Sequence, residues 1–345
     1  MNLRDSTIAN NINGGATHLI RFDDTGELEM SNNILWQPGK LTLLYPGGGQ
    51  NLDSNDIRYN IVSDNTTLPQ GPYNVQNDPQ FIDPELSNFG LRISSPALDF
   101  SPPVAGNDVG IDGRPRDQQV RPGPPRALLR DAGALERQPS DPYLINGTFD
   151  GSLRLWPNDF PDYTHWVALN DGPAGVSGSA EMFIPGDQTG EPGGFQIASI
   201  YGVKQCFRVP WPGNYTLAAR GFSRADGSVI FPDTPALNWR LRYNSHNCTG
   251  SIDFEGDLLL PGNIGWNSPQ APALITVPES NWGFQTTLEI SLGVLQNFND
   301  PAAQNSLFAR LDNVVLHYQD DADVIFRNGF EIPDNVIEVT SPTSF

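Results

Sequence analysis

The chain has 345 residues, of which 40 are acidic and 20 are basic, and it contains 34 Gly and 31 Pro. The formal net charge of −20 at pH 7 argues against binding to nucleic acid or to anionic membranes, because few cations are present to displace counterions from phosphates. Abundant Gly and Pro, without a sustained helical period of apolar residues, exclude a helical protein and indicate an all-β chain with room for two domains.

The first 98 residues contain a repeated pattern, apolar-x-x-Asn-Ile, which begins at Ile8, Met30 and Ile57. The repeats are 22 and 27 residues apart. Such spacing, with Asn at a fixed place, predicts a parallel β-solenoid in which apolar side chains point inward and each Asn amide bonds its counterpart in the next coil. We therefore expect residues 1–98 to form about three coils of a short parallel β-helix.

Three coils form a stack only about 15 Å high, and the first coil would leave its apolar interior and a sheet edge open. No apolar leader segment follows Met1, although features described below indicate export. We therefore expect the chain to be the C-terminal part of a longer protein, or a partner to cover the open coil of an otherwise monomeric chain.

Four short phrases follow in order: DPQFIDP (78–84), SPALD (95–99), DGRPR (112–116) and DAGALE (131–136). This series resembles the C-terminal segment of the choice-of-anchor Q family of right-handed parallel β-helix proteins. The resemblance covers residues 1–137 and implies a secreted or surface protein, without implying a reaction. Pro and Gly oppose further strand pairing, so residues 99–141 are expected to form a strap that closes the last coil, followed by a linker.

Residues 142–319 contain strand-like runs separated by turn signals, which is typical of a jelly-roll β-sandwich. The segment LINGTFD (144–150) is expected to be the opening strand and to pair with residues 310–316 near the end of the domain. The other expected strands are residues 196–201, 205–209, 215–222, 238–243, 251–260, 273–277, 286–292 and 307–318.

Five phrases stand out in this domain: NGTFD (146–150), SGSA (177–180), PGNYTL (212–217), ITVP (275–278) and LDNV (311–314). They resemble carbohydrate-binding modules of the family 4/9 type, which have the galactose-binding-like fold. The resemblance implies that this domain binds a polysaccharide or another glycan, with the β-helix as a stalk. It also implies a structural Ca²⁺ held by Asp150 and Asp312, with backbone carbonyls and Asn146 as further ligands. The alternative is that these carboxylates only cap surface turns.

Exposed aromatic rings can stack on sugars, while neighbouring polar groups bond the hydroxyls. Trp211 lies between Pro210 and Pro212, in a turn-like context that disfavours burial, and Trp266 precedes a strand-like run. We expect these two Trp to form the sugar platform, and the alternative for each is a place in the core. Further candidates for the carbohydrate site are Trp239, Trp282, Tyr243 and Arg240, with Tyr201, Arg242 and Gln285 as additional polar groups.

The two cysteines, Cys206 and Cys248, have no nearby His/Cys group that would complete a zinc site. A disulfide between them is expected, with two buried free thiols as the alternative. A disulfide indicates an oxidising compartment, so the expected location is extracellular or at the cell surface. No apolar run is long enough to predict insertion into a membrane.

Catalytic motifs are absent from the sequence: the four His have no ligand spacing, and no P-loop, G-x-S-x-G or H-E-x-x-H pattern occurs. The main interpretation is a non-catalytic protein. Two alternatives stay open: the C-terminal portion of a β-helix polysaccharide lyase or glycoside hydrolase with its catalytic coils upstream, and a structural adhesin that binds protein. Residues 320–345 are expected to form a tail, in which DVIFRNGFE (323–331) resembles a phrase of many secreted bacterial proteins.

Overall fold

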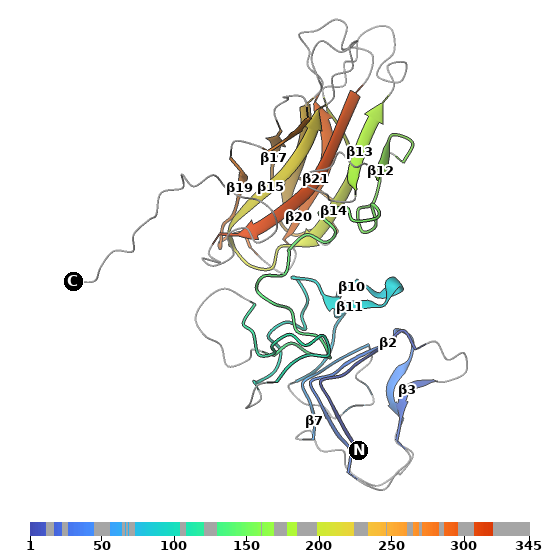
Figure 1. Cartoon of the computed structure of the whole chain (residues 1–345). Helices are drawn as coiled ribbons and strands as arrows, with labels where there is room; N and C mark the ends of the chain where they lie inside the picture. Colours follow the sequence, from blue (N-terminus) through green and yellow to red (C-terminus); the bar gives the residue numbers. More distant parts are fainter. Residues whose placement is uncertain are drawn as a thin grey trace, which may run out of the picture.

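The fold is all-β, as expected, with one short 3-10 helix, η1 (Pro84–Leu86), among the described residues. Short parallel strands lie at the N-terminal end, and a two-layered sandwich follows (Figure 1). No helix in the described part of the chain is long and apolar enough to cross a membrane. The computed structural model describes residues 1–11, 17–22, 27–44, 56–63, 66, 68, 73–103, 108–120, 130–159, 161–168, 178–184, 199–223, 234–245, 247–260, 265–268, 271–282, 286–295 and 307–319; the expected tail, 320–345, lies outside them.

The described residues of 1–76 contain three short parallel sheets, and we term them the parallel segment. Parallel pairing was predicted for this region, and buried apolar side chains such as Met30 and Leu35 fill the space between the sheets. One sheet contains β1 (Asn2–Arg4), β4 (Glu29–Ser31) and β7 (Ile57–Arg58); the second contains β2 (Thr7–Ala9), β5 (Ile34–Trp36), β8 (Asn60–Val62) and β9 (Asn74–Gln76); the third contains β3 (His18–Arg21) and β6 (Leu41–Leu44).

The strand register confirms the second repeat interval and corrects the first. Met30 pairs with Ile57, as the repeat predicts. In the first turn, however, Met30 pairs with Leu3 and not with Ile8. Both intervals are therefore 27 residues long. The match at Ile8 arises by chance in a stretch that is rich in Asn. The register of the stacked strands is set instead by the apolar residues that pair between them.

Side-chain amides form the predicted ladder at one bend of the parallel segment. The Nδ2 of Asn33 donates to Oδ1 of Asn60 (2.9 Å), and the Nδ2 of Asn60 donates to Oδ1 of Asn74 (2.9 Å). In the first turn the backbone N–H of Ser6 donates to Oδ1 of Asn33 (3.0 Å). Asn33 and Asn60 are fully buried, so the ladder satisfies polar groups inside the stack.

The described residues between 77 and 141, which include those of the predicted strap at 99–141, fold back along the parallel segment; we term them the strap. The strap begins with an antiparallel hairpin of β10 (Phe81–Asp83) and β11 (Asn88–Leu91) around η1. Further along, the backbone N–H of Ala134 donates to Oγ1 of Thr7 in the first turn (3.0 Å). The strap was expected over the last coil, but this contact places it along the flank of the stack as far as the first turn.

A buried network of charged groups joins three of the four strap phrases. The two carboxylate oxygens of Asp131 accept from the backbone N–H groups of Asp99 (2.8 Å) and Arg137 (2.7 Å). Glu136 Oε2 accepts from the Asp131 N–H (3.0 Å) and lies 3.6 Å from Arg116 Nε. Burial raises the pKa of Glu136 to about 7 and that of Asp131 well above its ordinary value. These phrases therefore hold the strap together through backbone hydrogen bonds.

The sandwich consists of two antiparallel sheets. The predicted runs 196–201 and 205–209 both overlap one strand, β14, and residues 196–198 lie outside the described residues. The larger sheet has the order β12 (Thr164–Val167), β13 (Ser179–Ile184), β21 (Leu307–Tyr318), β15 (Gly213–Ser223) and β18 (Gly265–Asn267), and β19 (Ala273–Val277) also pairs with β15. The smaller sheet has the order β14 (Ser199–Arg208), β20 (Thr287–Leu295), β16 (Thr234–Arg242) and β17 (Phe254–Leu259).

The segment 144–150 forms turns, and the predicted opening strand is wrong. The backbone φ angles of Asn146 (52°) and Phe149 (49°) lie in the left-handed region, which is incompatible with an extended strand. The segment nevertheless lies beside β21, because the backbone N–H of Val314 donates to the carbonyl of Gly147 (2.8 Å). The predicted neighbour is therefore correct, although the predicted secondary structure is not.

Charged side chains connect the strap to the sandwich. The Arg154 guanidinium, which follows the turns at the start of the sandwich, donates to both carboxylate oxygens of Asp83 and to Oε2 of Glu85 (3.1 Å). Arg137 donates to the carbonyls of Leu91 (2.9 Å) and Pro142 (2.6 Å). These contacts hold the hairpin of the strap against the first residues of the sandwich.

Candidate functional site

The outer face of the smaller sheet carries a strip of polar side chains. On β16 and β20 every second residue, such as Leu241 and Leu288, is buried in the core between the sheets. Because side chains alternate along a strand, the intervening residues point outward. The register sets them opposite one another across the two strands. We term this strip the polar face: Asn238, Arg240, Arg242, Thr287, Glu289 and Ser291.

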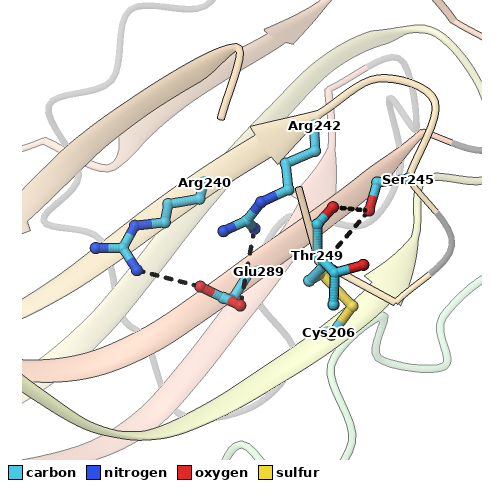
Figure 2. Close-up of a disulfide and its surroundings, with 7 residues drawn as sticks. Cys206, Arg240, Arg242, Ser245, Thr249 and Glu289 are labelled. Carbon is cyan, nitrogen blue, oxygen red and sulfur yellow. Dashed lines mark hydrogen bonds and ion pairs between the residues drawn. A yellow bond between two sulfur atoms is a disulfide. The ribbon is translucent and has the colours of Figure 1, made fainter. Parts of the chain in front are cut away.

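Glu289 lies between the two arginines of the polar face (Figure 2). Its Oε1 is 3.4 Å from Arg240 Nη1, and its Oε2 is 3.7 Å from Arg242 Nη1. Arg240 also contacts Glu255 of β17, with 3.3 Å between Nε and Oε2. The carboxylate of Glu289 and the side chain of Arg242 are almost fully buried, so this charge cluster is held rigidly on the sheet.

Several buried polar atoms on this face have no hydrogen-bond partner among the described residues. They include Oδ1 of Asn238, Oγ1 of Thr287, and Nε and Nη1 of Arg242. Leaving a buried polar group unpaired costs roughly 1–3 kcal/mol, so we expect these groups to have a partner that the described residues do not supply, such as water or a ligand. The set combines an amide acceptor, a hydroxyl that can donate or accept, and charged donors. That combination suits a ligand rich in hydroxyl groups.

The predicted disulfide between Cys206 and Cys248 is present beside the polar face (Figure 2). Cys206 lies on β14 opposite Glu289 of β20, and Cys248 belongs to the loop between β16 and β17. Within this loop the Ser245 hydroxyl donates to the carbonyl of Thr249 (2.8 Å) and accepts from its N–H (3.1 Å). The bridge therefore fixes a compact loop against the outer side of the smaller sheet.

Trp211 cannot be part of the predicted sugar platform, because its ring is buried. Its exposed fraction is 8%, and its ring packs edge-on against Tyr143 (6.1 Å between centroids) and Tyr318 (5.9 Å). The neighbouring prolines suggested an exposed turn, but aromatic residues from distant parts of the chain enclose this turn. The carbonyl of Trp211 accepts from the Tyr215 hydroxyl (2.6 Å), which locks it further into the core.

The other aromatic candidates are partly buried and are distributed over both sheets. Trp266, on β18 of the larger sheet, packs against Phe222 (5.5 Å between centroids). Trp239 packs against the core between the sheets, and the Nε1 of Trp282 donates to the carbonyl of Val209 (3.0 Å). The structure therefore does not bring these Trp together. Of these candidates Arg240 lies in the polar face. Tyr243, which follows Arg242, packs against the core between the sheets and edge-on against Phe254 (6.1 Å between centroids).

Sequence reasoning missed four residues of the polar face: Asn238, Thr287, Glu289 and Ser291. The signal was available in the alternation of each strand, because these residues lie between apolar neighbours that face the core.

Asp312 and Asp150 are close enough to interact electrostatically, as the resemblance implied. Asp312 is fully buried; its Oδ1 accepts from the Asn313 N–H (2.6 Å), and its Oδ2 has no partner among the described residues. Burial, with the nearby Asp150 charge, raises the pKa of Asp312 to about 7. Asn146 donates its Nδ2 to the carbonyls of Ser152 and Arg154 (2.9 and 3.1 Å), so only its oxygen remains as a ligand.

This arrangement fits a hard cation, although it supplies only part of a Ca²⁺ shell, which takes about six to eight oxygens. The unpaired oxygen of Asp312 is the observation that favours the ion. The described residues contain no cluster of three or more His, Cys, Asp and Glu side chains, so backbone carbonyls would have to complete the shell. A structural Ca²⁺ at Asp312 and Asp150 is therefore a proposal.

We expect the variant Asp312→Asn to be more stable than the wild type above pH 7 when a chelator is present. Because burial raises the pKa of Asp312 from 3.8 to about 7, its contribution to stability is fully present below pH 3.8 and is lost as the pH rises through 7. The amide has no charge to bury, so its advantage at pH 8 should be on the order of 2 kcal/mol. Urea unfolding at pH 5 and pH 8 measures it.

Added Ca²⁺ should reverse this difference, because a bound cation favours the ionised carboxylate. The wild type should gain stability with Ca²⁺ and the variant should not. An Asp312→Asn variant that is less stable at pH 8 in chelator would contradict the prediction, and equal responses to Ca²⁺ would rule out the ion.

No protein-family model and no curated protein matches the chain. Among solved structures, three neighbours are carbohydrate-binding modules. One, described as "CBM4 structure and function", is 17% identical, covers 51% of this chain and 99% of its own, and has a TM-score of 0.28. The xylan-binding CBM22-2 domain of Paenibacillus barcinonensis Xyn10C is 9% identical over 49% of this chain and 95% of its own, with a TM-score of 0.30.

The tandem of CBM22-1 and CBM22-2 from the same protein is 12% identical, covers 55% of this chain and 53% of its own, and has a TM-score of 0.33. At these identities and TM-scores the likeness does not extend to a ligand, so the case for a ligand must come from the polar face itself.

Proposed function

We propose that this chain belongs to a secreted or cell-surface, non-catalytic protein that binds a polysaccharide across the polar face of its sandwich. The parallel segment would be the end of a right-handed β-helix stalk. The observation that carries the proposal is the strip of outward-facing polar side chains in which some atoms, such as Asn238 Oδ1 and Thr287 Oγ1, have no hydrogen-bond partner among the described residues.

The chemistry of the polar face matches a chain of sugar hydroxyls, each of which can both donate and accept. Asn238 Oδ1 can accept a hydroxyl proton, while Arg242 can only donate. A hydrogen bond from a charged group contributes roughly 1.5–3 kcal/mol, which is more than one between neutral groups. We therefore expect Arg242 to make the strongest contact with the sugar. The ion pair between Arg242 and Glu289 fixes the guanidinium, so little side-chain entropy is lost on binding.

Three observations that do not involve the polar face support an exported, rod-like protein. The disulfide between Cys206 and Cys248 is typical of oxidising compartments. The parallel ladders, with the Asn33 and Asn60 amides stacked inside them, have the pairing expected of β-helix coils. The strap phrases add the resemblance to surface proteins with variable anchors.

Affinity electrophoresis in gels that contain soluble xylan, β-glucan or mannan tests this function. The wild type should be retarded by at least one neutral polysaccharide. The double variant Asn238→Ala/Thr287→Val should bind at least tenfold more weakly, which corresponds to about 1.4 kcal/mol. The control Thr276→Ala removes an exposed hydroxyl from the larger sheet and should bind like the wild type.

Two outcomes would contradict the proposal. One is a folded wild type that none of the polysaccharides retards. The other is the release of reducing sugar ends from the retarding polysaccharide, which would show an enzyme.

A further inference from the structure

A pocket of ≈ 630 Å³ lies where the parallel segment and the strap meet the sandwich. One wall contains Trp36 of the parallel segment and Arg92 of the strap, and the other contains Arg208 of β14 and Asn247 of the disulfide loop. Small-ligand sites typically have volumes of about 300–1,000 Å³ and often lie at domain junctions. The pocket therefore has the size and the place of a ligand site.

The two walls are held in position by contacts outside the pocket itself. The Cys206–Cys248 bridge fixes the loop that carries Asn247. The ion pair between Arg154 and Asp83 joins the hairpin of the strap to the sandwich. A preformed cavity of this kind can bind a ligand without a large ordering cost.

Two arginines line the pocket, and neither forms an ion pair with a carboxylate of the described residues. Arg92 donates from Nε to the carbonyl of Phe81 (3.1 Å) and from Nη2 to that of Ile82 (3.1 Å), which fixes its guanidinium and leaves Nη1 available. The Arg208 side chain makes no hydrogen bond or ion pair with another described residue. Burial lowers the pKa of Arg92, so an anion in the pocket would relieve the cost of its charge.

Carboxylates are plentiful in this chain, whose net charge is −20, and they pair with other arginines. Arg130, for example, pairs with Asp108 and Asp117. The pocket does contain one carboxylate, that of Asp78, whose Oδ1 accepts from the Gln80 N–H (2.8 Å). The charged lining thus has a net positive charge in a strongly acidic protein, which selects an anionic ligand.

The remaining lining groups indicate a sugar and not a small inorganic anion. The partly buried Trp36 ring packs against the core cluster and also lines the pocket. Ser94 donates its hydroxyl to Oε1 of Gln80 (2.6 Å), which fixes the amide and leaves its Nε2 as a donor. An aromatic ring, oriented amide donors and two guanidiniums are the groups that recognise a ring with hydroxyls and a negative charge.

We propose that this junction pocket is a second site, which binds a pyranose unit that carries a carboxylate or sulfate group. Trp36 would stack on the ring, and Arg92 and Arg208 would hold the anion. The site adjoins the polar face, since Arg208 is the register partner of Thr287. A single acidic polysaccharide chain can therefore occupy both sites. The pocket has its own lining residues and does not depend on the polar face.

Isothermal titration calorimetry with trigalacturonate, a sulfated galactose oligosaccharide and xylotriose tests this site on the whole chain. At least one anionic oligosaccharide should bind, and its affinity should fall as NaCl is added. Arg208→Gln should weaken that affinity at least tenfold, since a charge-assisted bond is lost. Trp36→Leu should also weaken it. Arg58→Gln, at an exposed arginine outside the pocket, should bind like the wild type.

The two anionic ligands distinguish a uronate site from a sulfate site, and binding of either supports the proposal. Retained anion binding in Asn238→Ala/Thr287→Val supports a separate pocket. The proposal is overturned if neither anionic ligand binds the wild type, or if Arg208→Gln and Trp36→Leu both bind normally. In either of those cases the binding of a neutral polysaccharide across the polar face would be unaffected, so the two proposals fail separately.

Discussion

Replacing both Cys206 and Cys248 with Ser is expected to lower the free energy of unfolding of the sandwich by roughly 4 kcal/mol. The bridge closes a loop across 42 positions of sequence, and its loss restores that conformational freedom to the unfolded chain. The folded state also loses the covalent bond that holds the loop between β16 and β17 against β14. For a domain of this size the midpoint of thermal unfolding should fall by roughly 10 °C.

Tryptophan fluorescence can follow this loss, because six of the seven Trp lie in residues 142–319. Urea titrations of the wild type, of the double Ser variant and of the wild type with reductant form one set. The reduced wild type should behave like the variant. An unchanged midpoint in the variant would show that the loop is held by other contacts, such as those between Ser245 and Thr249.

The parallel segment shows what a sequence repeat can and cannot specify. The repeat at Met30 and Ile57 predicted the correct pairing, because buried apolar residues and the Asn33–Asn60 amide ladder recur together. The first turn has Ser6 where the later turns have Asn, so a search for Asn selected the wrong register. The first hydrogen bond of such a ladder can be donated by a backbone N–H group. No particular residue type is then required at that position, so the sequence does not reveal it.

In the sandwich, too, the sequence indicates the exposure of some side chains and not of others. Along β16 and β20 alternation separates core residues such as Leu241 and Leu288 from the outward-facing ones, since each side of a strand has one environment. The burial of Trp211 could not be predicted, because Tyr143 and Tyr318 lie far from it in the sequence. The junction pocket was likewise beyond reach of the sequence. It requires Trp36 and Arg208 to lie close together, which depends on how strap and sandwich pack.

The second large effect is expected from Gly147→Ala, at the turn that opens the sandwich. An added Cβ would lie 2.0 Å from the carbonyl oxygen of Val314, far inside contact distance. Val314 belongs to β21, which is held between β13 and β15 and cannot move aside. The turn must therefore separate from β21, which breaks the 2.8 Å hydrogen bond to Gly147 and exposes the buried Phe149. We expect a loss of roughly 3 kcal/mol in unfolding free energy.

Gly151→Ala provides a matched control four residues along the same segment. Gly151, unlike Gly147, has a left-handed backbone (φ 75°), and nothing lies within 4 Å of an added Cβ there. Its variant should lose only the roughly 1–2 kcal/mol that a left-handed Ala costs. Urea unfolding of both variants separates the steric contact from backbone strain. If Gly147→Ala is no less stable than Gly151→Ala, the docking of residues 144–150 on β21 does not stabilise the sandwich.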